Sequence, residues 1–213
     1  MTSKPKIILT SDDYGLSSLN DVKILEMLEL EYLTSVSVMV KRISNKKNKQ
    51  FSELINISER KNISIGLHLE FSEQDIINDV ESQFNRFKDY LGVSPDYIDI
   101  HKNSHFKGDY NILAEFCHHS HIAFRKYPLT TSVVASPNLS VIATNMAIEN
   151  IESMIDRFEG NKIYEIIFHI GTYDPYSKSK LNKERELDVK KLIQVHQIIK
   201  KKKMILTNFK FVQ

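Results

Sequence analysis

The chain has 213 residues, of which 41% are hydrophobic and 26% are charged, a composition typical of a globular protein with one sizeable core. Its 29 Lys and Arg residues nearly balance its 27 Asp and Glu residues, so its charge gives no reason to expect a nucleic-acid partner. The only cysteine, Cys117, excludes an intrachain disulfide and fits a reducing compartment.

Short apolar runs alternate with longer amphipathic segments along the chain. Alternating or β-branched runs predict strands at residues 6–10, 34–40, 63–69, 97–100, 122–125, 164–169 and, split or shortened, 204–211. Helical spacing predicts helices at residues 19–30, 48–60, 75–91, 110–119, 145–158 and 184–201. Gly92 and Gly160 are expected to end two of these helices. Residues 129–140 show no clear period and are expected to form a loop.

Strands that alternate with helices imply parallel β-α units. Six or seven such units in a chain of this length predict an α/β fold with mostly parallel strands, an incomplete or distorted (β/α) barrel that is TIM-like but smaller than the eightfold one. A doubly wound open sheet is the alternative. In both architectures the active site lies at the C-terminal ends of the strands.

Three further expectations concern the whole chain. No linker rich in Pro, Gly or Ser is visible, so residues 1–213 are expected to form one domain. No apolar segment reaches the length needed to cross a bilayer, and the apolar run near the start is too short for a signal peptide. We therefore expect a cytoplasmic protein without membrane insertion. The sequence leaves a homodimer open.

Titratable side chains gather at the ends of the predicted strands. They are Asp12 and Asp13 at the first, His68 and Glu70 at the third, Asp99, His101 and His105 at the fourth, Arg125 at the fifth, and His169, with Glu165 inside the strand, at the sixth. Each alone is more often a core or surface residue. Because strand ends converge in a barrel, one Asp and two His from three strands would form a ligand set for a divalent metal. The remaining Asp and His could then act as general base and general acid.

Seven segments also resemble, in the same order, motifs of the YdjC/ChbG-like carbohydrate deacetylases. They are TSDDYGLS, LTSVSVMV, IGLHLEF, YIDIHKNSHF, IAFRKYP, EIIFHIG and NKERELDVKKL, which together span nearly the whole chain. The resemblance implies a distorted barrel related to the polysaccharide-deacetylase fold. It also implies a divalent-metal hydrolase that removes an acetyl group from an N-acetylated sugar, either a mono- or oligosaccharide or a sugar conjugate.

The resemblance assigns roles to individual residues. Asp13, His68 and His101 match the family's metal ligands. Asp12 matches the general base, and His169 matches the general acid. In hydrolysis of an acetamide, the base takes a proton from water and the acid protonates the departing sugar amine.

Three further residues are expected to contact substrate or support the ligands. Arg125 matches the arginine of the family's RxP segment and would position substrate or neighbouring acids. His105 is expected to support the region of His101. Glu165 lies inside the strand that ends in His169.

The sequence also departs from the family pattern. Asn103 stands where the family has the middle histidine of its HxHxH segment, and Ile170 replaces a proline. In the last motif the arginine position falls on Lys183, with Arg185 displaced. The ligand and proton-transfer positions are retained, so we expect the chemistry to be kept while the substrate specificity stays open.

The metal and two alternative functions also stay open at this level. Two imidazoles and one carboxylate suit zinc, cobalt or nickel, whereas the resemblance implies magnesium. A metal-dependent phosphoesterase is one alternative, although it would need more ligands and more phosphate-binding cations. A sugar-binding homologue without turnover is the other. Phe106, Tyr127 and Tyr173 are candidates for stacking on a sugar ring or for covering the core.

Overall fold

The structure, a computed structural model, describes residues 3–43, 48–71, 75–125, 139–143 and 147–212. Within these residues eight strands form one sheet: β1 (Lys6–Tyr14), β2 (Ser35–Val38), β3 (Ser64–Leu69), β4 (Tyr97–Ile100), β5 (Ala123–Phe124), β6 (Leu139–Ala143), β7 (Ile163–Phe168) and β8 (Ile205–Leu206). The helices are α1 (Ser18–Glu29), α2 (Asn48–Lys61), α3 (Ile76–Leu91), α4 (Tyr110–His119), α5 (Ile148–Ile155) and α6 (Arg185–Lys201). Short 3-10 turns are η1 (Val40–Arg42), η3 (Asn103–His105) and η4 (Phe209–Phe211).

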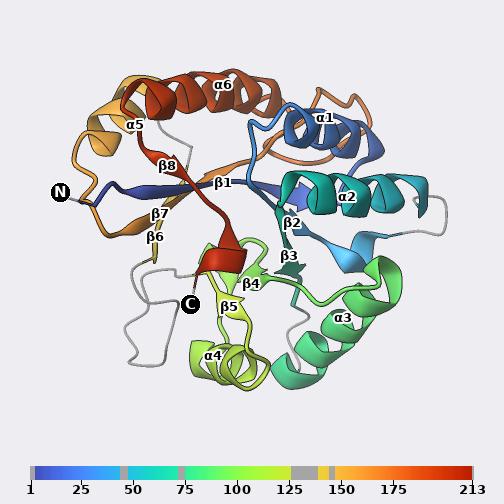
Figure 1. The fold of residues 1–213 in the computed structure, drawn as a ribbon. Helices are drawn as coiled ribbons and strands as arrows, with labels where there is room; N and C mark the ends of the chain where they lie inside the picture. Colours follow the sequence, from blue (N-terminus) through green and yellow to red (C-terminus); the bar gives the residue numbers. More distant parts are fainter. Residues whose placement is uncertain (1–2, 44–47, 72–74, 126–138, 144–146, 213) are drawn as a thin grey trace.

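All strand pairs in this sheet are parallel. The strand order is β5-β4-β3-β2-β1-β7-β6, and β8 pairs with the first residues of β1. The sheet curls, and the helices form an outer ring around it (Figure 1). The fold is therefore the incomplete (β/α) barrel predicted from the sequence, with β5 and β6 as the edge strands of the described sheet.

Alternation along the strands separates an apolar outer face from a largely polar inner face. In β3, Ile65, Leu67 and Leu69 belong to the main hydrophobic core, which also contains residues of the surrounding helices. The alternate residues of β3 instead lie inside the barrel, where Gly66 contacts the ring of Tyr97. The polar side chains of the strands are thus collected in the barrel interior.

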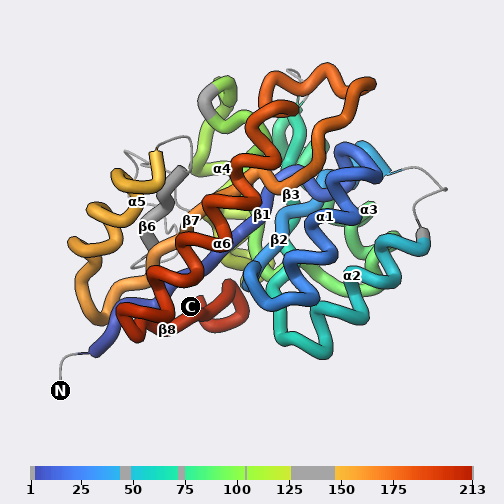
Figure 2. Tube along the Cα trace, turned by 90° about the horizontal axis from the view of Figure 1, so that it is seen from above, coloured from blue at the N-terminus to red at the C-terminus, as the bar shows by residue number. Residues whose placement is uncertain are grey.

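A second, smaller core closes the end of the barrel at which the strands begin. It contains Ile8, Tyr97, Phe209 and Val212. The rings of Tyr97 and Phe209 stack with their centroids 3.8 Å apart. Figure 2 shows both termini at this end of the molecule and the segment between β7 and α6 at the opposite end. The C-terminal ends of the strands are therefore left for a functional site.

Several element boundaries differ from the sequence predictions. Strand β6 begins at Leu139, inside the predicted loop 129–140, most of which lies outside the described residues. Helix α5 ends at Ile155, and Gly160 lies beyond it, where an added Cβ would sit 1.8 Å from the carbonyl oxygen of Ser3. Gly160 therefore serves a close backbone approach rather than a helix end. None of the described helices is both long and apolar enough to span a membrane.

Gly92 follows α3 in the left-handed conformation, with φ of 71°, so this helix ends as predicted. The last strand is also shortened as predicted, because β8 has two residues and η4 replaces the remainder. The first strand, by contrast, continues to Tyr14 instead of ending at residue 10. This extension places both acids of the TSDDYGLS segment inside β1.

Candidate metal centre

A β-bulge in β1 brings both acids to the same end of the barrel. Ser11 pairs with Val36 and Tyr14 pairs with Val38, so β1 carries one extra residue between these pairs. Asp13 has a φ of 69°, a left-handed conformation that Asp tolerates better than most residues. Because the bulge interrupts the usual alternation, Asp12 and Asp13 need not point to opposite faces of the sheet.

Three ligand atoms from β1, β3 and the end of β4 converge at this end. Asp13 Oδ1 lies 3.4 Å from His68 Nε2 and 3.2 Å from His101 Nδ1, and these two nitrogens are 3.1 Å apart. Ligands bound at about 2.0–2.1 Å around a tetrahedral ion are about 3.3 Å from one another. Asp13 Oδ1 is buried and accepts no hydrogen bond from the described residues. The donor set therefore fits a divalent cation.

Burial raises the pKa of the Asp13 carboxyl, but the His101 and His68 rings outweigh burial and hold the pKa well below its usual range. Burial lowers the pKa of His68, but the charges of Asp99 and Asp12 raise it well above its usual range. Both shifts have the same cause, the opposite charges that face each other across the site.

Asp99 supports His68 from behind. Its Oδ2 lies 2.7 Å from His68 Nδ1, which directs Nε2 of the ring toward Asp13 and His101. Asp99 also accepts hydrogen bonds from the Ser37 hydroxyl and from Arg125. Burial raises the pKa of Asp99, but the charges of Arg125 and His68 keep it below its usual value.

Arg125 is fully buried and joins three carboxyl groups. It donates two hydrogen bonds to Asp12, at 2.9 and 2.8 Å, and its Nη2 lies 2.8 Å from Glu165 Oε1. Asp99 is the third partner. Arg125 is therefore paired with acids of the barrel interior. Thr10 donates to Glu165 at 2.7 Å, and burial raises the pKa of Glu165 to about 7 against the opposing charge of Arg125.

Arg185, two residues after the motif position that falls on Lys183, reaches the proposed metal ligands. Arg185 is fully buried at the start of α6, and its Nη2 lies 2.7 Å from Asp13 Oδ2. Lys183 is exposed. Burial distinguishes these two cations, because the sequence of a motif with two candidate cations does not reveal which one is buried.

Asp99 was noted in the sequence without a role. A usable signal was the alternation in YIDI, where Asp99 stands between Ile98 and Ile100 and so faces the other side of the sheet. An acid on the inner face of a barrel strand needs a buried partner. His68 and Arg125 are those partners.

His169 and His105 lie at the edges of this centre. His169 is half-buried directly after β7, near enough that its charge lowers the pKa of Asp13. Its backbone N–H donates to Asp188 at 2.9 Å. His105 is exposed in η3 and lines a pocket of about 230 Å³.

That pocket adjoins the metal-ligand cluster, formed by Asp13, His68 and His101, because His101 belongs to both. Its other walls include Lys102, the aromatic pair Phe71 and Phe106, and the ion pair of Arg42 with Glu70. The two aromatic rings have centroids 4.7 Å apart. Asn103 lies in the adjoining turn and accepts a hydrogen bond from the Tyr110 hydroxyl at 2.8 Å. Tyr173 is half-exposed beyond β7, and Tyr127 lies outside the described residues.

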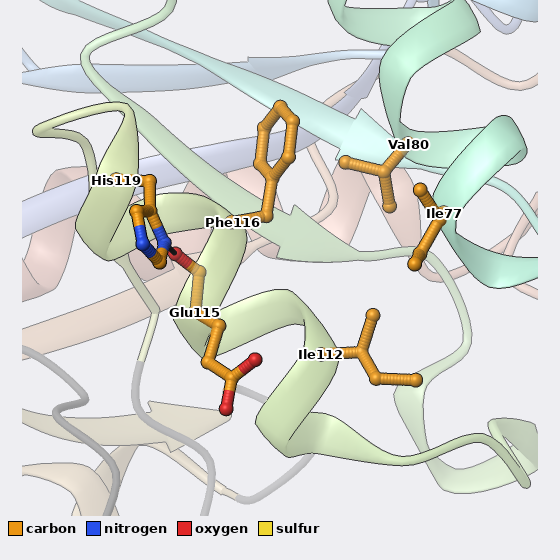
Figure 3. Close-up of a pocket in the computed structure, with 6 residues that line it drawn as sticks. All are labelled: Ile77, Val80, Ile112, Glu115, Phe116 and His119. Atoms are coloured by element: carbon orange, nitrogen blue, oxygen red, sulfur yellow. Dashed lines mark hydrogen bonds between the residues drawn. The ribbon is translucent and has the colours of Figure 1, made fainter.

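A pocket of about 300 Å³ between α3 and α4 is larger but has different chemistry (Figure 3). Ile77, Val80, Ile112 and Phe116 form most of its wall. The ring of His119 is hydrogen-bonded to the backbone of its own helix, at the carbonyl oxygen four residues earlier. Since its polar groups do not converge, we place the functional site at the metal-ligand cluster.

Comparisons with known proteins agree with this architecture. A family model described as YdjC-like protein matches residues 70–201, a segment that contains His101, Arg125, His169 and Arg185 but begins after His68. No curated protein matches the chain.

Among solved structures, a protein from Enterococcus faecalis V583, provisionally named a cellobiose-phosphate cleavage protein, has 19% identity and a TM-score of 0.76 over 97% of this chain and 98% of its own. A cobalt complex of a family 4 acetyl xylan esterase from Clostridium thermocellum has 13% identity and a TM-score of 0.53, over 95% and 87%. A Bacillus cereus polysaccharide deacetylase has 10% identity and a TM-score of 0.52, over 96% and 92%. These likenesses show a shared fold.

Proposed function

The chain belongs to the YdjC-like family, and from this premise we propose that it is a divalent-metal-dependent hydrolase that removes an acetyl group from an N-acetylated sugar. The observation that carries the proposal is the convergence of Asp13, His68 and His101 beside Asp12. Two neighbours with the same fold are named as a deacetylase and an acetyl esterase, which supports acetyl transfer to water as the reaction.

Asp13, His68 and His101 would hold the cation. A divalent cation held there would act as a Lewis acid that polarises the acetyl carbonyl and strengthens water as a nucleophile. The carboxylate and two imidazoles suit Zn²⁺ or Co²⁺ by ligand type, and Mg²⁺ remains a candidate through the family. The cobalt ion in one neighbour's structure makes Co²⁺ a sensible first probe.

Asp12 is proposed as the general base. Arg125 fixes the plane of its carboxylate through two hydrogen bonds, while each oxygen keeps a further lone pair for a water proton. His169 is proposed as the general acid that protonates the sugar amine as the C–N bond breaks. The bond from its backbone N–H to Asp188 holds the chain where this ring is attached.

The sugar is proposed to bind in the pocket beside His101. Phe71 and Phe106 offer an aromatic surface on which a pyranose ring could stack, and Arg42 with Glu70 offers groups for sugar hydroxyls. His105 stands at the rim of the same pocket. In this proposal Arg125 and Glu165 act on the acids of the barrel interior rather than on the sugar.

The metal site is tested first by removing each ligand. Asp13→Ala, His68→Ala and His101→Ala should each lower the Zn²⁺ or Co²⁺ content measured by elemental analysis after dialysis, while far-UV circular dichroism stays native. Asn103→Ala is the matched control, because Asn103 bonds to Tyr110 and is not part of the ligand cluster. Full occupancy in all three ligand variants would refute the site.

The reaction is tested by measuring acetate release from a panel of N-acetylated mono- and oligosaccharides by the metal-loaded protein. We expect release that stops on addition of a chelator and returns with the metal. Hydrolysis of a phosphomonoester panel without acetate release would favour a phosphoesterase instead. Sugar binding without release of either product would favour a binding protein.

A further inference from the structure

Arg185 is a buried cation beside a proposed metal ligand. Its side chain is fully buried, and its Nη2 donates to Asp13 Oδ2 at 2.7 Å. Its Nε and Nη1 have no hydrogen-bond partner among the described residues. Asp13 is therefore the partner that accounts for the position of this guanidinium within the described part of the chain.

The two oxygens of Asp13 have separate environments. Oδ2 is taken by Arg185, whereas Oδ1 faces His68 and His101. Asp13 has a left-handed backbone within a bulge, so regular strand geometry does not set the direction of its side chain. The bond to Arg185 fixes which oxygen is presented to the cation.

The place of Arg185 in the fold makes its burial costly. It is the first residue of α6, where the helix dipole disfavours a cation and favours acids such as Glu186 and Asp188. Burying a guanidinium also carries a desolvation cost that only close pairing offsets. Helix formation therefore does not account for an arginine at this position.

The same turn of α6 also holds the chain that follows β7. Asp188 accepts the backbone N–H of His169, and Glu186 accepts that of Tyr173. At Gly171 an added Cβ would lie 2.9 Å from Arg185 Cδ, so the backbone passes directly against the arginine. Arg185 is therefore held in place by the segment that carries His169.

We propose that Arg185 is a positioning residue for the metal ligand Asp13, which it holds so that only Oδ1 is presented to the cation. The inference rests on the proposed metal site. It predicts that Arg185 strengthens metal binding, whereas electrostatics alone predicts that it weakens metal binding. A positive charge beside a cation site weakens binding by repulsion, whereas a group that orders a ligand strengthens it.

The sign of the change in metal affinity decides between these two roles. Arg185→Met keeps an unbranched apolar stem and removes the guanidinium. We expect Co²⁺ and Zn²⁺ to bind about 10- to 100-fold more weakly to this variant, as measured by competition with a chromophoric chelator. Unchanged or tighter binding to a natively folded Arg185→Met would overturn the inference.

Two further variants complete the design. Arg60→Met removes an exposed arginine of α2 that pairs with Glu29 of α1, and should leave affinity unchanged. Arg185→Lys keeps the charge without the planar fork, and should bind with an affinity between those of the parent and Arg185→Met. If circular dichroism shows Arg185→Met to be unfolded, Arg185→Lys decides, and parent-like affinity in it would refute the inference.

The measurement contains no substrate, so it separates this inference from the proposed reaction. A parent protein that binds neither Co²⁺ nor Zn²⁺ nor Mg²⁺ would overturn both the metal site and the role of Arg185. A parent that binds metal but releases no acetate would leave the inference intact while refuting the deacetylase.

Discussion

Asp12 and His169 flank the metal-ligand cluster without belonging to it, so their proposed roles predict a distinct kinetic signature. Asp12→Asn and His169→Ala should each retain the cation and the fold, yet lower turnover by about 10²- to 10⁴-fold, the usual contribution of a general acid or base.

The control for this pair is the metal content of each variant, measured on the same sample as the rate. Asp12→Asn keeps an acceptor for Arg125, which limits the disturbance of the buried charges. Parent-like turnover in a variant lacking both groups would contradict the assignment.

Glu165 should make stability depend on pH. Its pKa is raised from 4.5 to about 7 in the folded protein, first by burial. A raised folded-state pKa gives stability that is fully present below the unfolded pKa and is lost as pH rises through the folded one. The parent should therefore lose stability relative to Glu165→Gln between about pH 4.5 and 7.

Melting temperatures of the parent and Glu165→Gln, compared at several pH values with chelator present, measure this effect. Gln mimics the protonated acid and can still accept from Thr10. The difference between the two proteins should move in favour of the variant as pH rises. A difference that stays constant from pH 5 to 8 would show that Glu165 does not titrate in this range.

Residues at strand ends could be predicted from sequence because an apolar run ending in a titratable side chain is a local signal. Asp13, His68 and His101 are of this kind, and the structure brings their ligand atoms together. Arg185 could not be identified in the same way. Its partner is 172 residues away in the chain, and its burial depends on the path of the backbone at Gly171.

At the scale of elements, a glycine in β3, Gly66, leaves room for the ring of Tyr97 from the neighbouring strand β4. An added Cβ at Gly66 would lie 2.2 Å from Tyr97 Cζ, while the Tyr97 hydroxyl accepts a hydrogen bond from Ser35 on the far side of β3. The tyrosine ring thus lies across Gly66. Gly66→Ala should destabilise the protein by about 1–3 kcal/mol through overpacking.

Urea denaturation measures this loss of stability, and a double-mutant cycle shows whether the Tyr97 ring causes it. In a Tyr97→Ala background the same glycine substitution should cost less, because the clashing ring is gone. Equal costs in the two backgrounds would mean that backbone conformation, rather than the ring, requires the glycine.

Helices were better predicted than the irregular strands. The amphipathic spacing of α3 and α4 extends to their ends, and Gly92 marks one of these ends by its left-handed conformation. The end of β1 was misplaced because Asp12 and Asp13 resemble a strand terminus. Because Arg125 and Arg185 form ion pairs with these two acids, both can be buried, and β1 continues to pair with β2 up to Tyr14.

At the scale of the whole molecule, η4 closes the end of the barrel opposite the metal-ligand cluster. Phe209 is buried against Tyr97, whereas Phe211, two residues later, is 58% exposed. Phe209→Ala should lower the free energy of unfolding by about 3–5 kcal/mol, the usual cost of removing a buried Phe. Phe211→Ala is the matched control and should stay within about 0.5 kcal/mol of the parent.

Equal effects of the two substitutions, in denaturant titrations, would show that η4 is not the closure that the ring stacking indicates.

The barrel class itself was predictable, because strands alternating with helices leave few alternatives. Closure by η4 was not, since a single turn carries no periodic pattern. It depends on one ring meeting another from a distant strand.

The central place of β1 bears on how the chain folds during its synthesis. One edge of β1 pairs with β2, which follows closely in the chain. Its other edge pairs with β7, which is made much later, since Thr10 of β1 and Glu165 of β7 are 155 residues apart. At about 5–20 residues per second, a ribosome needs roughly 8–30 s to add that length of chain. During this interval the early strands can pair while Asp12 and Asp13 lack arginines still to be made, so the proposed metal site should form only near the end of translation.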